Sequence, residues 1–240
     1  MKYLSFLTTL ILVIQVITGI NSVNAQQNKD WFPFQTDDDF SSSVIDMSSW
    51  LDKPAGKHGF LDMEGDNFVF EDGTPVKFWG VNIADFRVYV DKQTSEKWAG
   101  YLAKYGVNAV RFHKWTWSGY RDLDTSTYIE PTLLDKLDYF DSQLKERGIY
   151  FGWSHIYGHR PQPGDSSKLL AYDEIEKAGS GHLQGSTIGL VNFAPDLQDL
   201  NIELTVNLLN HVNPYTGKRY ADDPALAYIE LQNEDDIFFP

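Results

Sequence analysis

The 240-residue sequence contains no cysteine, so no disulfide can stabilise the fold and no lipid-modified cysteine can anchor the protein to a membrane surface. Basic residues are also few, because 20 Lys and Arg stand against 34 Asp and Glu, which gives a net charge of −14. This balance disfavours nucleic acids and anionic membranes as partners and is compatible with a neutral substrate. Fold stability therefore has to come from core packing.

Long hydrophobic runs are missing except at the start of the chain. Met1-Lys2 is followed by an apolar run over about 4–20 and by the small-residue site Val23-Asn24-Ala25. This pattern is typical of a secretory signal peptide over 1–25, with a mature chain that begins near Gln26 and is exported to the extracellular space or the periplasm. An uncleaved membrane anchor is the alternative. Residues 26–58 are expected to form an irregular lead-in without chemistry.

Turn signals divide the next stretch into short strands. The turns Glu64-Gly65-Asp66 and Glu71-Asp72-Gly73 separate three apolar runs between residues 59 and 79. Such spacing predicts β-hairpins over 59–75, and hairpins that lead into a barrel commonly close its bottom. We therefore expect one barrel domain over 59–240 that includes these hairpins.

From residue 76 onward, apolar periodicities alternate between strand and helix. Strands are predicted over 76–82, 107–113 and 149–155 and again near 225–236, and helices over 94–105, 131–148 and 196–212. The alternation predicts an α/β fold, either an open doubly wound sheet or a closed (β/α)8 barrel. No G-x-G-x-x-G turn follows the first strand, which argues against the dinucleotide-binding version, and no cofactor is expected.

The last predicted strand carries the most informative motif. Ala227, Ile229 and Leu231 alternate with Glu230, Gln232 and Glu234, which is the period of a strand with one acidic face. Acidic residues inside such an apolar segment indicate the polar mouth of a barrel. The pair Asn233-Glu234 would stand at the carboxyl end of this strand.

This strand, with Asp222-Asp223-Pro224-Ala225 before it and Asn233-Glu234 at its end, resembles the fourth barrel strand of the clan A glycoside hydrolases, which include the family 5 cellulases and mannanases. The resemblance implies a truncated (β/α)8 barrel with about its first four units, because a complete barrel needs roughly 250 residues. It makes Glu234 the general acid/base and Asn233 the residue that binds the 2-hydroxyl of the sugar. Asp235 stands where many members have Pro.

The second strand extends the resemblance. Ala109, Arg111 and His113 share one strand face. The phrase Gly106 to Arg111 is similar to clan A, in which an Arg on the second strand orients the nucleophile. The alternative is an Arg in an ordinary salt bridge, and His113 is predicted either to contact substrate or to pack.

Further candidates follow the ends of predicted strands. The resemblance implies that His155, in Trp153-Ser154-His155, lines the sugar site. Trp115, Trp117 and Tyr157 could stack on sugar faces, although loop packing is an equally good interpretation of each. The long loop over 158–189 is expected to shape the cleft.

A retaining glycosidase needs a second carboxylate about 5 Å from the first. Glu230 would lie roughly 13 Å from Glu234 along an extended strand, so it is predicted to be a hydrogen-bonded residue of the barrel interior. In clan A the nucleophile stands on the seventh strand. The resemblance thus implies a secreted retaining hydrolase of a β-linked glycan, and we expect its front half alone to be inactive and prone to aggregate.

Two other functions remain open from the residues. A metal-dependent barrel hydrolase would need ligands such as His155 and His159, but no His-Glu-x-x-His motif exists and no metal is predicted. A secreted, non-catalytic carbohydrate-binding protein would use the same aromatic residues without Glu234. The oligomeric state cannot be predicted from the sequence.

Overall fold

The computed structural model describes residues 40–235 and 237–238, which belong to one compact unit that starts at Asp38. The predicted signal peptide over 1–25, the first part of the lead-in up to residue 39, and Asp236 lie outside the described residues. Within the described ranges, no helix combines the length and the apolar character needed to cross a bilayer.

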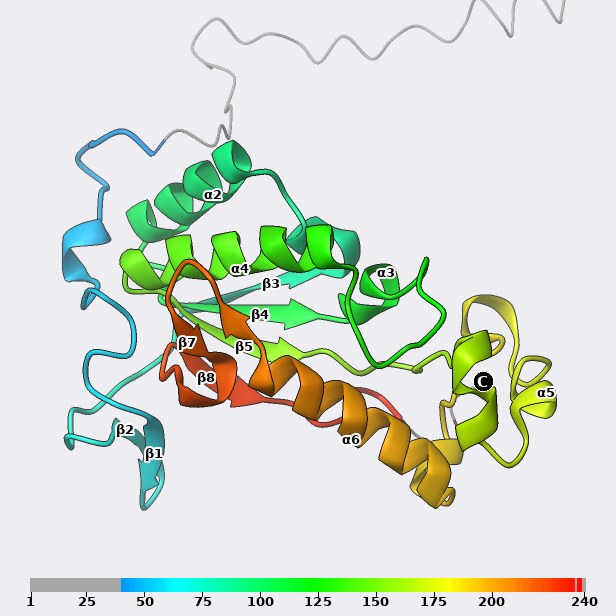
Figure 1. The fold of residues 1–240 in the computed structure, drawn as a ribbon. Coiled ribbons are helices and arrows are strands. Elements are labelled where there is room, and N and C mark those ends of the chain that lie inside the picture. Colours follow the sequence, from blue (N-terminus) through cyan, green and yellow to red (C-terminus); the bar gives the residue numbers. More distant parts are fainter. Residues whose placement is uncertain (1–39, 236, 239–240) are drawn as a thin grey trace, which may run out of the picture. The chain divides into compact units, whose positions relative to one another are not determined.

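A four-stranded parallel sheet forms the centre of this unit (Figure 1). Its strands, in spatial order, are β3 (Gly80–Ala84), β4 (Ala109–His113), β5 (Tyr150–Ser154) and β8 (Leu226–Ile229). The helices between them are α2 (Lys92–Lys104), α4 (Pro131–Glu146) and α6 (Pro195–Asn210). Sequential strands are neighbours and every connection carries a helix, which confirms the predicted α/β alternation.

Capping residues set the starts of the first two helices. Asp91 precedes α2, and its Oδ1 accepts a hydrogen bond of 2.7 Å from the backbone N–H of Thr94. Glu130 does the same for α4, where Pro131 occupies the first helical position and has no N–H that needs a partner. These caps place the helix starts within three residues of their predicted positions.

Helices α2 and α4 lie side by side along the sheet (Figure 1). Val110 and Phe112 on β4 are fully buried, and the ring of Phe112 lies 5.6 Å from that of Phe140 on α4. Arg111 and His113 alternate with them and are half-buried on the other face. The predicted division of β4 into an apolar face and a polar face is therefore confirmed.

Short strands β1 (Leu61–Glu64) and β2 (Asn67–Phe70) form the expected antiparallel hairpin. The third run differs from the prediction, because Pro75 bridges to Val69 and the parallel strand begins only at Gly80. The ring of Phe70 stacks at 5.0 Å on Tyr150, the first residue of β5. The hairpin thus packs at the amino ends of the parallel strands, opposite the edge where the chain leaves them.

The remaining elements are short. They are η1 (Ser48–Trp50), η2 (Asp85–Val88), α3 (Thr116–Gly119), η3 (Pro163–Lys168), α5 (Tyr172–Ile175), η4 (Gly181–Leu183), η5 (Leu190–Asn192), β6 (Val212–Asn213), β7 (Lys218–Arg219) and η6 (Tyr220–Asp222). Four of them lie between β5 and α6, so the long loop predicted over 158–189 is built largely of single helical turns.

Strand β8 is shorter than predicted. Pairing with β5 ends near Ile229, and the backbone N–H of Glu230 donates a last bond of 2.7 Å to the carbonyl of Trp153. Leu231, expected on the apolar face, is 74% exposed. The alternation read from the sequence therefore stops at Glu230, and Asn233 and Glu234 stand in the loop beyond the strand.

Candidate active site

Three strand ends at the carboxyl edge of the sheet carry a strained residue. Among the described residues, the non-glycine residues with positive φ are Asp85 at 58°, Lys114 at 44° and Glu234 at 46°. Asp85 and Lys114 directly follow β3 and β4, and Glu234 lies in the loop after β8. Each such conformation costs about 1–3 kcal/mol and is typically retained where function requires it. This edge of the sheet is therefore the first place to look for a site.

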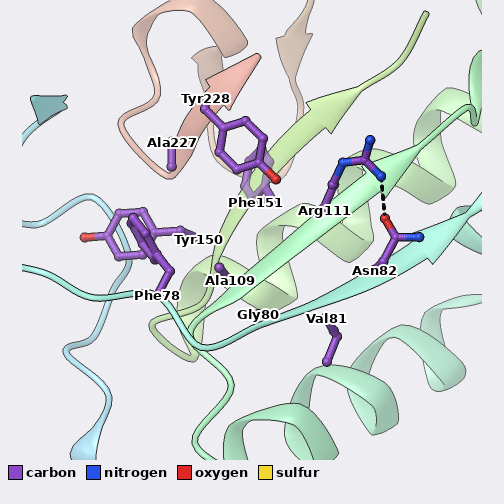
Figure 2. Close-up of a pocket in the computed structure, with 10 residues that line it drawn as sticks. All are labelled: Phe78, Gly80, Val81, Asn82, Ala109, Arg111, Tyr150, Phe151, Ala227 and Tyr228. Atoms are coloured by element: carbon purple, nitrogen blue, oxygen red, sulfur yellow. Dashed lines mark hydrogen bonds between the residues drawn. The ribbon is translucent and has the colours of Figure 1, made fainter. Parts of the chain in front are cut away.

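Arg111 is the centre of the hydrogen-bond network at this edge. Its Nη2 and Nε lie 2.8 Å and 3.0 Å from one carboxylate oxygen of Glu230, and Nη1 donates to Oδ1 of Asn82 at 2.9 Å. Figure 2 shows the guanidinium directed toward Asn82 across the face of the sheet. The Arg111–Glu230 pair agrees with the salt-bridge interpretation of Arg111 and with the prediction that Glu230 is hydrogen-bonded.

The same guanidinium fixes the orientation of the Asn233 side chain. Nη2 of Arg111 donates to Oδ1 of Asn233 at 2.7 Å, and because a guanidinium can only donate, the amide oxygen must face it. The amide nitrogen of Asn233 then points away, and this atom is buried without a hydrogen-bond partner among the described residues. A buried donor without an acceptor costs roughly 1–3 kcal/mol, so this donor is available to a ligand oxygen.

Ser154 connects Arg111 to His113. Its hydroxyl oxygen accepts from Nη2 of Arg111 at 2.8 Å and lies 3.0 Å from Nδ1 of His113. Burial, Arg111 and Lys114 lower the pKa of His113, so the imidazole is neutral near pH 7. The hydroxyl can then donate to Nδ1, which leaves a proton on Nε2 and makes His113 a second donor at the site.

Glu234 is exposed, and within the described residues its carboxylate accepts no hydrogen bond. The negative charge of Glu234 acts on two neighbouring groups. It counteracts the lowering of the His113 pKa, and, after burial, it contributes to raising the pKa of Tyr157. The carboxylate thus stands near His113 and Tyr157 and forms no salt bridge with the residues that the structure describes.

Asp235, the residue that departs from the clan A pattern, joins this motif to the long loop. One of its carboxylate oxygens accepts from the backbone N–H of Gly189, and the other accepts from Nε2 of Gln232 at 2.7 Å. Burial raises the pKa of Asp235. The loop predicted to shape the cleft is therefore attached directly beside Glu234.

Two predicted sugar-binding residues, His155 and Trp115, lie in the core instead. Both are fully buried, and their rings are 6.5 Å apart. His155 bonds through Nε2 to the hydroxyl of Thr205 on α6 at 2.8 Å, and burial lowers its pKa to about 4. Successive side chains of a strand point to opposite faces of the sheet. Ser154 pairs with His113 and faces the hydrogen-bond network of Arg111, so the next residue, His155, points to the opposite face.

Trp117 and Tyr157 lie together, with their ring centroids 5.4 Å apart. Two cations cover this pair, since Nζ of Lys114 is 5.5 Å from the Trp117 centroid and 5.7 Å from that of Tyr157, and the Arg160 guanidinium is 4.5 Å from Trp117. Tyr157 is also only 5% exposed. The pair supports cations rather than presenting two open ring faces for stacking.

The histidines considered as metal ligands bind protein groups. Nε2 of His159 lies 2.7 Å from the hydroxyl of Ser126, which donates to the carboxylate of Asp165 at 2.7 Å. In the part of the chain that the structure describes, no three His, Asp or Glu side chains are grouped as a metal site would require.

A hollow of 330 Å³ lies on the same face as Arg111, toward the amino ends of the strands (Figure 2). Apolar residues dominate its lining, among them Phe78, Tyr150 and Tyr228. Gly152 is required here, because a Cβ at that position would lie 2.2 Å from the ring of Tyr228. This face of the sheet is thus an apolar floor with polar residues above it, as in a barrel interior.

Several site residues were not identified from the sequence. Lys114, Ser154, Arg160 and Asn82 all contact the predicted residues. Strand alternation could have found two of them, because Asn82 and Ser154 pair with Arg111 and His113 in the parallel register. Lys114 and Arg160 lie in loops, for which no periodicity predicts an orientation.

No family model and no curated protein matches this chain, but solved structures do. It is similar to the endo-1,4-beta-mannanase of Rhizomucor miehei, with 19% identity and a TM-score of 0.51 over 73% of this chain and 48% of that one. It is also similar to a glycoside hydrolase family 5 mannosidase of the same organism, with 15% identity and a TM-score of 0.54 over 75% and 49%.

A variant of that mannosidase in complex with mannosyl-fructose gives 16% identity and a TM-score of 0.55 over 74% and 49%. The chain therefore spans about half the length of the solved structures it matches. At these identities the likeness establishes the fold. The four strands and their helices have the arrangement of a (β/α)8 barrel truncated to about half, which confirms the predicted fold class.

Proposed function

We propose that this chain is the front half of a secreted, retaining glycoside hydrolase that cleaves a β-linked polysaccharide or oligosaccharide. Glu234 serves as general acid/base, and Asn233 binds a hydroxyl of the sugar. The observation that carries the proposal is the Arg111–Asn233 contact of 2.7 Å, which turns the amide nitrogen of Asn233, a buried donor without a partner among the described residues, away from the guanidinium. A sugar hydroxyl is an acceptor of suitable size and polarity for that donor.

The chemistry follows from the positions of these groups. A retaining reaction begins when one carboxylate attacks the anomeric carbon while a carboxylic acid gives its proton to the departing oxygen. Glu234, beside Asn233, is the proton donor and later the base that activates water. Among the described residues no carboxylate is placed as its partner, since Glu230 is held by Arg111. The nucleophile therefore belongs to the half of the barrel outside these residues.

Secretion is part of the proposal and rests on the apolar segment over 4–20 and the site Val23-Asn24-Ala25. The half-length match to complete barrels supports the inactivity of residues 26–240 alone. Coding sequence beyond the codon for Pro240 should then supply four more strand–helix units, with a Glu at the end of the seventh strand.

The test is the Glu234→Gln variant of the complete protein, assayed on β-linked glucan and mannan oligosaccharides. General acid/base catalysis contributes about 100- to 10,000-fold, so the rate of hydrolysis should fall by that factor while the oligosaccharide still binds. Glu64→Gln on β1, an exposed residue of the hairpin, is the matched control and should keep full activity. An unchanged rate in Glu234→Gln would contradict the proposal. Sugar binding without hydrolysis in the native protein would indicate a non-catalytic carbohydrate-binding protein.

A further inference from the structure

The aromatic pair near Glu234 holds more positive charge than a neutral sugar requires. Lys114 and Arg160 both lie on the Trp117–Tyr157 pair, within 5.7 Å of a ring centroid. Such cation–π contacts position a cation without neutralising it. We refer to Lys114, Trp117, Tyr157 and Arg160 as the cation cluster.

Several donors in the cation cluster have no acceptor. Nε of Arg160 and Nε1 of Trp117 are buried and have no hydrogen-bond partner among the described residues. Within those same residues no carboxylate forms an ion pair with Lys114, although Arg160 donates through Nη2 to the carbonyl of His182. A guanidinium does not lose its proton, so Nε of Arg160 needs an acceptor that the described residues do not supply.

The cation cluster adjoins the proposed catalytic groups. The Tyr157 ring lies 5.9 Å from that of His113, which bonds through Ser154 to Arg111. Lys114 directly follows His113 in the chain, and its left-handed backbone carries it out of the strand path. A group bound by the cluster would therefore belong to a sugar in or next to the cleavage site.

Charge in the surroundings makes the cluster unusual. The whole chain has a net charge of −14, yet the carboxylates at this edge are already engaged or separate from the cations. Glu230 is paired with Arg111, and Asp235 accepts bonds from Gly189 and Gln232. Glu234 is the third carboxylate of this edge, and it forms no ion pair with Lys114 or Arg160 among the described residues.

We propose that the cation cluster binds an anionic group of the glycan, a carboxylate of a uronic acid or a sulfate ester, so that the substrate is an acidic β-glycan. The inference rests on the proposed function and deepens it. It also replaces the expectation of a neutral substrate, which came from the net charge of the chain, because recognition depends on local rather than total charge.

The experiment compares matched substrates on the complete protein. Glucan and mannan oligosaccharides are assayed as the neutral parent, with the C6 hydroxyls oxidised to carboxylates, and with C6 sulfate esters. A charge-assisted contact predicts a kcat/KM at least about tenfold higher for one of the acidic forms, and this preference should decrease as salt is added. The form with the higher value identifies carboxylate or sulfate as the group bound.

The Lys114→Met variant should reduce the ratio of acidic to neutral kcat/KM by about tenfold, since the charge is removed and the stem is kept. Arg160→Met tests the second cation independently if the first variant fails to fold. Lys218→Met on β7 removes the same charge from an exposed position and should keep the native ratio. A ratio that stays constant while both rates fall would mean that Lys114 acts on Glu234, and it would overturn the inference.

The results also separate this inference from the function beneath it. Hydrolysis of neutral and acidic forms with equal efficiency would overturn the cation cluster as an anion site and leave the glycosidase proposal intact. Hydrolysis of none of the forms would remove both.

Discussion

Two polar clusters in this molecule have opposite imbalances of hydrogen-bonding groups. In the acid cluster, between α4 and η6, the Tyr220 hydroxyl lies 2.7 Å from Asp138 and 2.8 Å from Asp141, so two carboxylates share one hydroxyl donor, and Asp138 also lies 2.7 Å from Nε2 of His211. At the candidate site the reverse holds, since Asn233 and Arg160 have buried donors without acceptors. The acid cluster has more acceptors than donors, and the candidate site has buried donors without acceptors among the described residues.

The two clusters differ in how their unsatisfied hydrogen-bonding groups can find partners. Burial raises the pKa of Asp141 well above its ordinary value, so this carboxyl can take up a proton and donate to Tyr220, which donates in turn to Asp138. The acid cluster therefore completes itself inside the protein. Guanidinium and amide donors cannot adjust in this way. The donors of the candidate site need acceptors from outside the described residues, and because we propose that a glycan supplies them, we assign function to this site and stability to the acid cluster.

Removal of Arg111 should have the largest effect, because it releases the Asn233 amide and Glu230 together. We expect Arg111→Met in the complete protein to lower kcat by about 100-fold, since misplacement of a positioning group by about 1 Å can cost that much. The melting temperature should fall as well, because Glu230 and the Asn233 oxygen lose their donor, so kcat is compared at a temperature where this variant and its control are both folded. Arg219→Met, which breaks the exposed pair with Asp222, is the control and should retain activity. Equal loss in both variants would argue against a special role for Arg111.

The Tyr220→Phe variant tests the acid cluster by removing its hydroxyl donor. Loss of the hydroxyl leaves Asp138 and Asp141 without their shared donor, which should lower the free energy of unfolding by about 1–3 kcal/mol in urea titrations. Activity at saturating substrate should stay near that of the native protein. A loss of activity without a loss of stability would mean that the acid cluster serves function rather than stability, which contradicts our assignment.

Asp141→Asn sharpens the same comparison through pH. Because the folded pKa of Asp141 is raised, the native state binds more protons than the unfolded state above the ordinary value of 3.8. Stability should therefore decrease as pH rises from about 4 toward the folded pKa. In the Asn variant the amide donates to Tyr220 at every pH, so this decrease should vanish from urea titrations repeated at several pH values. Persistence of the slope would show that Asp141 is not the group that titrates.

An opposite pH effect is expected from the buried histidines. Burial lowers the pKa of His159 to about 4 in the folded state, whereas unfolding restores the ordinary value of 6.5. The unfolded state then binds the extra proton, so stability should decrease as pH falls from 6.5 to 4, by at most about 1.4 kcal/mol per pH unit. His159→Gln should flatten this part of the curve, measured by thermal unfolding. An unchanged slope would place the titration elsewhere, for example at His155.

Prediction from sequence succeeded where periodicity carried the information. The alternation of Val110 and Phe112 with Arg111 and His113 settled both faces of β4, and Pro131 and Gly148 bounded a helix. These patterns repeat over many residues, so one ambiguous position does not change the result.

Prediction was weaker where the site depends on loops. His155 was predicted to line the sugar site, but Ser154 is the residue of β5 that faces it. Strand β8 was predicted to reach Asn233, but it ends at Ile229. Lys114 was missed because its left-handed backbone has no signature in a residue that is neither Gly nor Asn. The position of Asn233 depends on a bond to Arg111, which is 122 residues away in the chain. Such long-range contacts have no local sequence pattern.

The central claim is that the candidate site is completed by a glycan, and the structure of the complete Glu234→Gln protein with a bound β-linked oligosaccharide tests it most directly. We predict that the amide nitrogen of Asn233 donates to a sugar hydroxyl and that the residue at 234 contacts the oxygen of the glycosidic bond. If the amide nitrogen instead donates to a protein group of the other barrel half, with the sugar bound elsewhere, the account is contradicted.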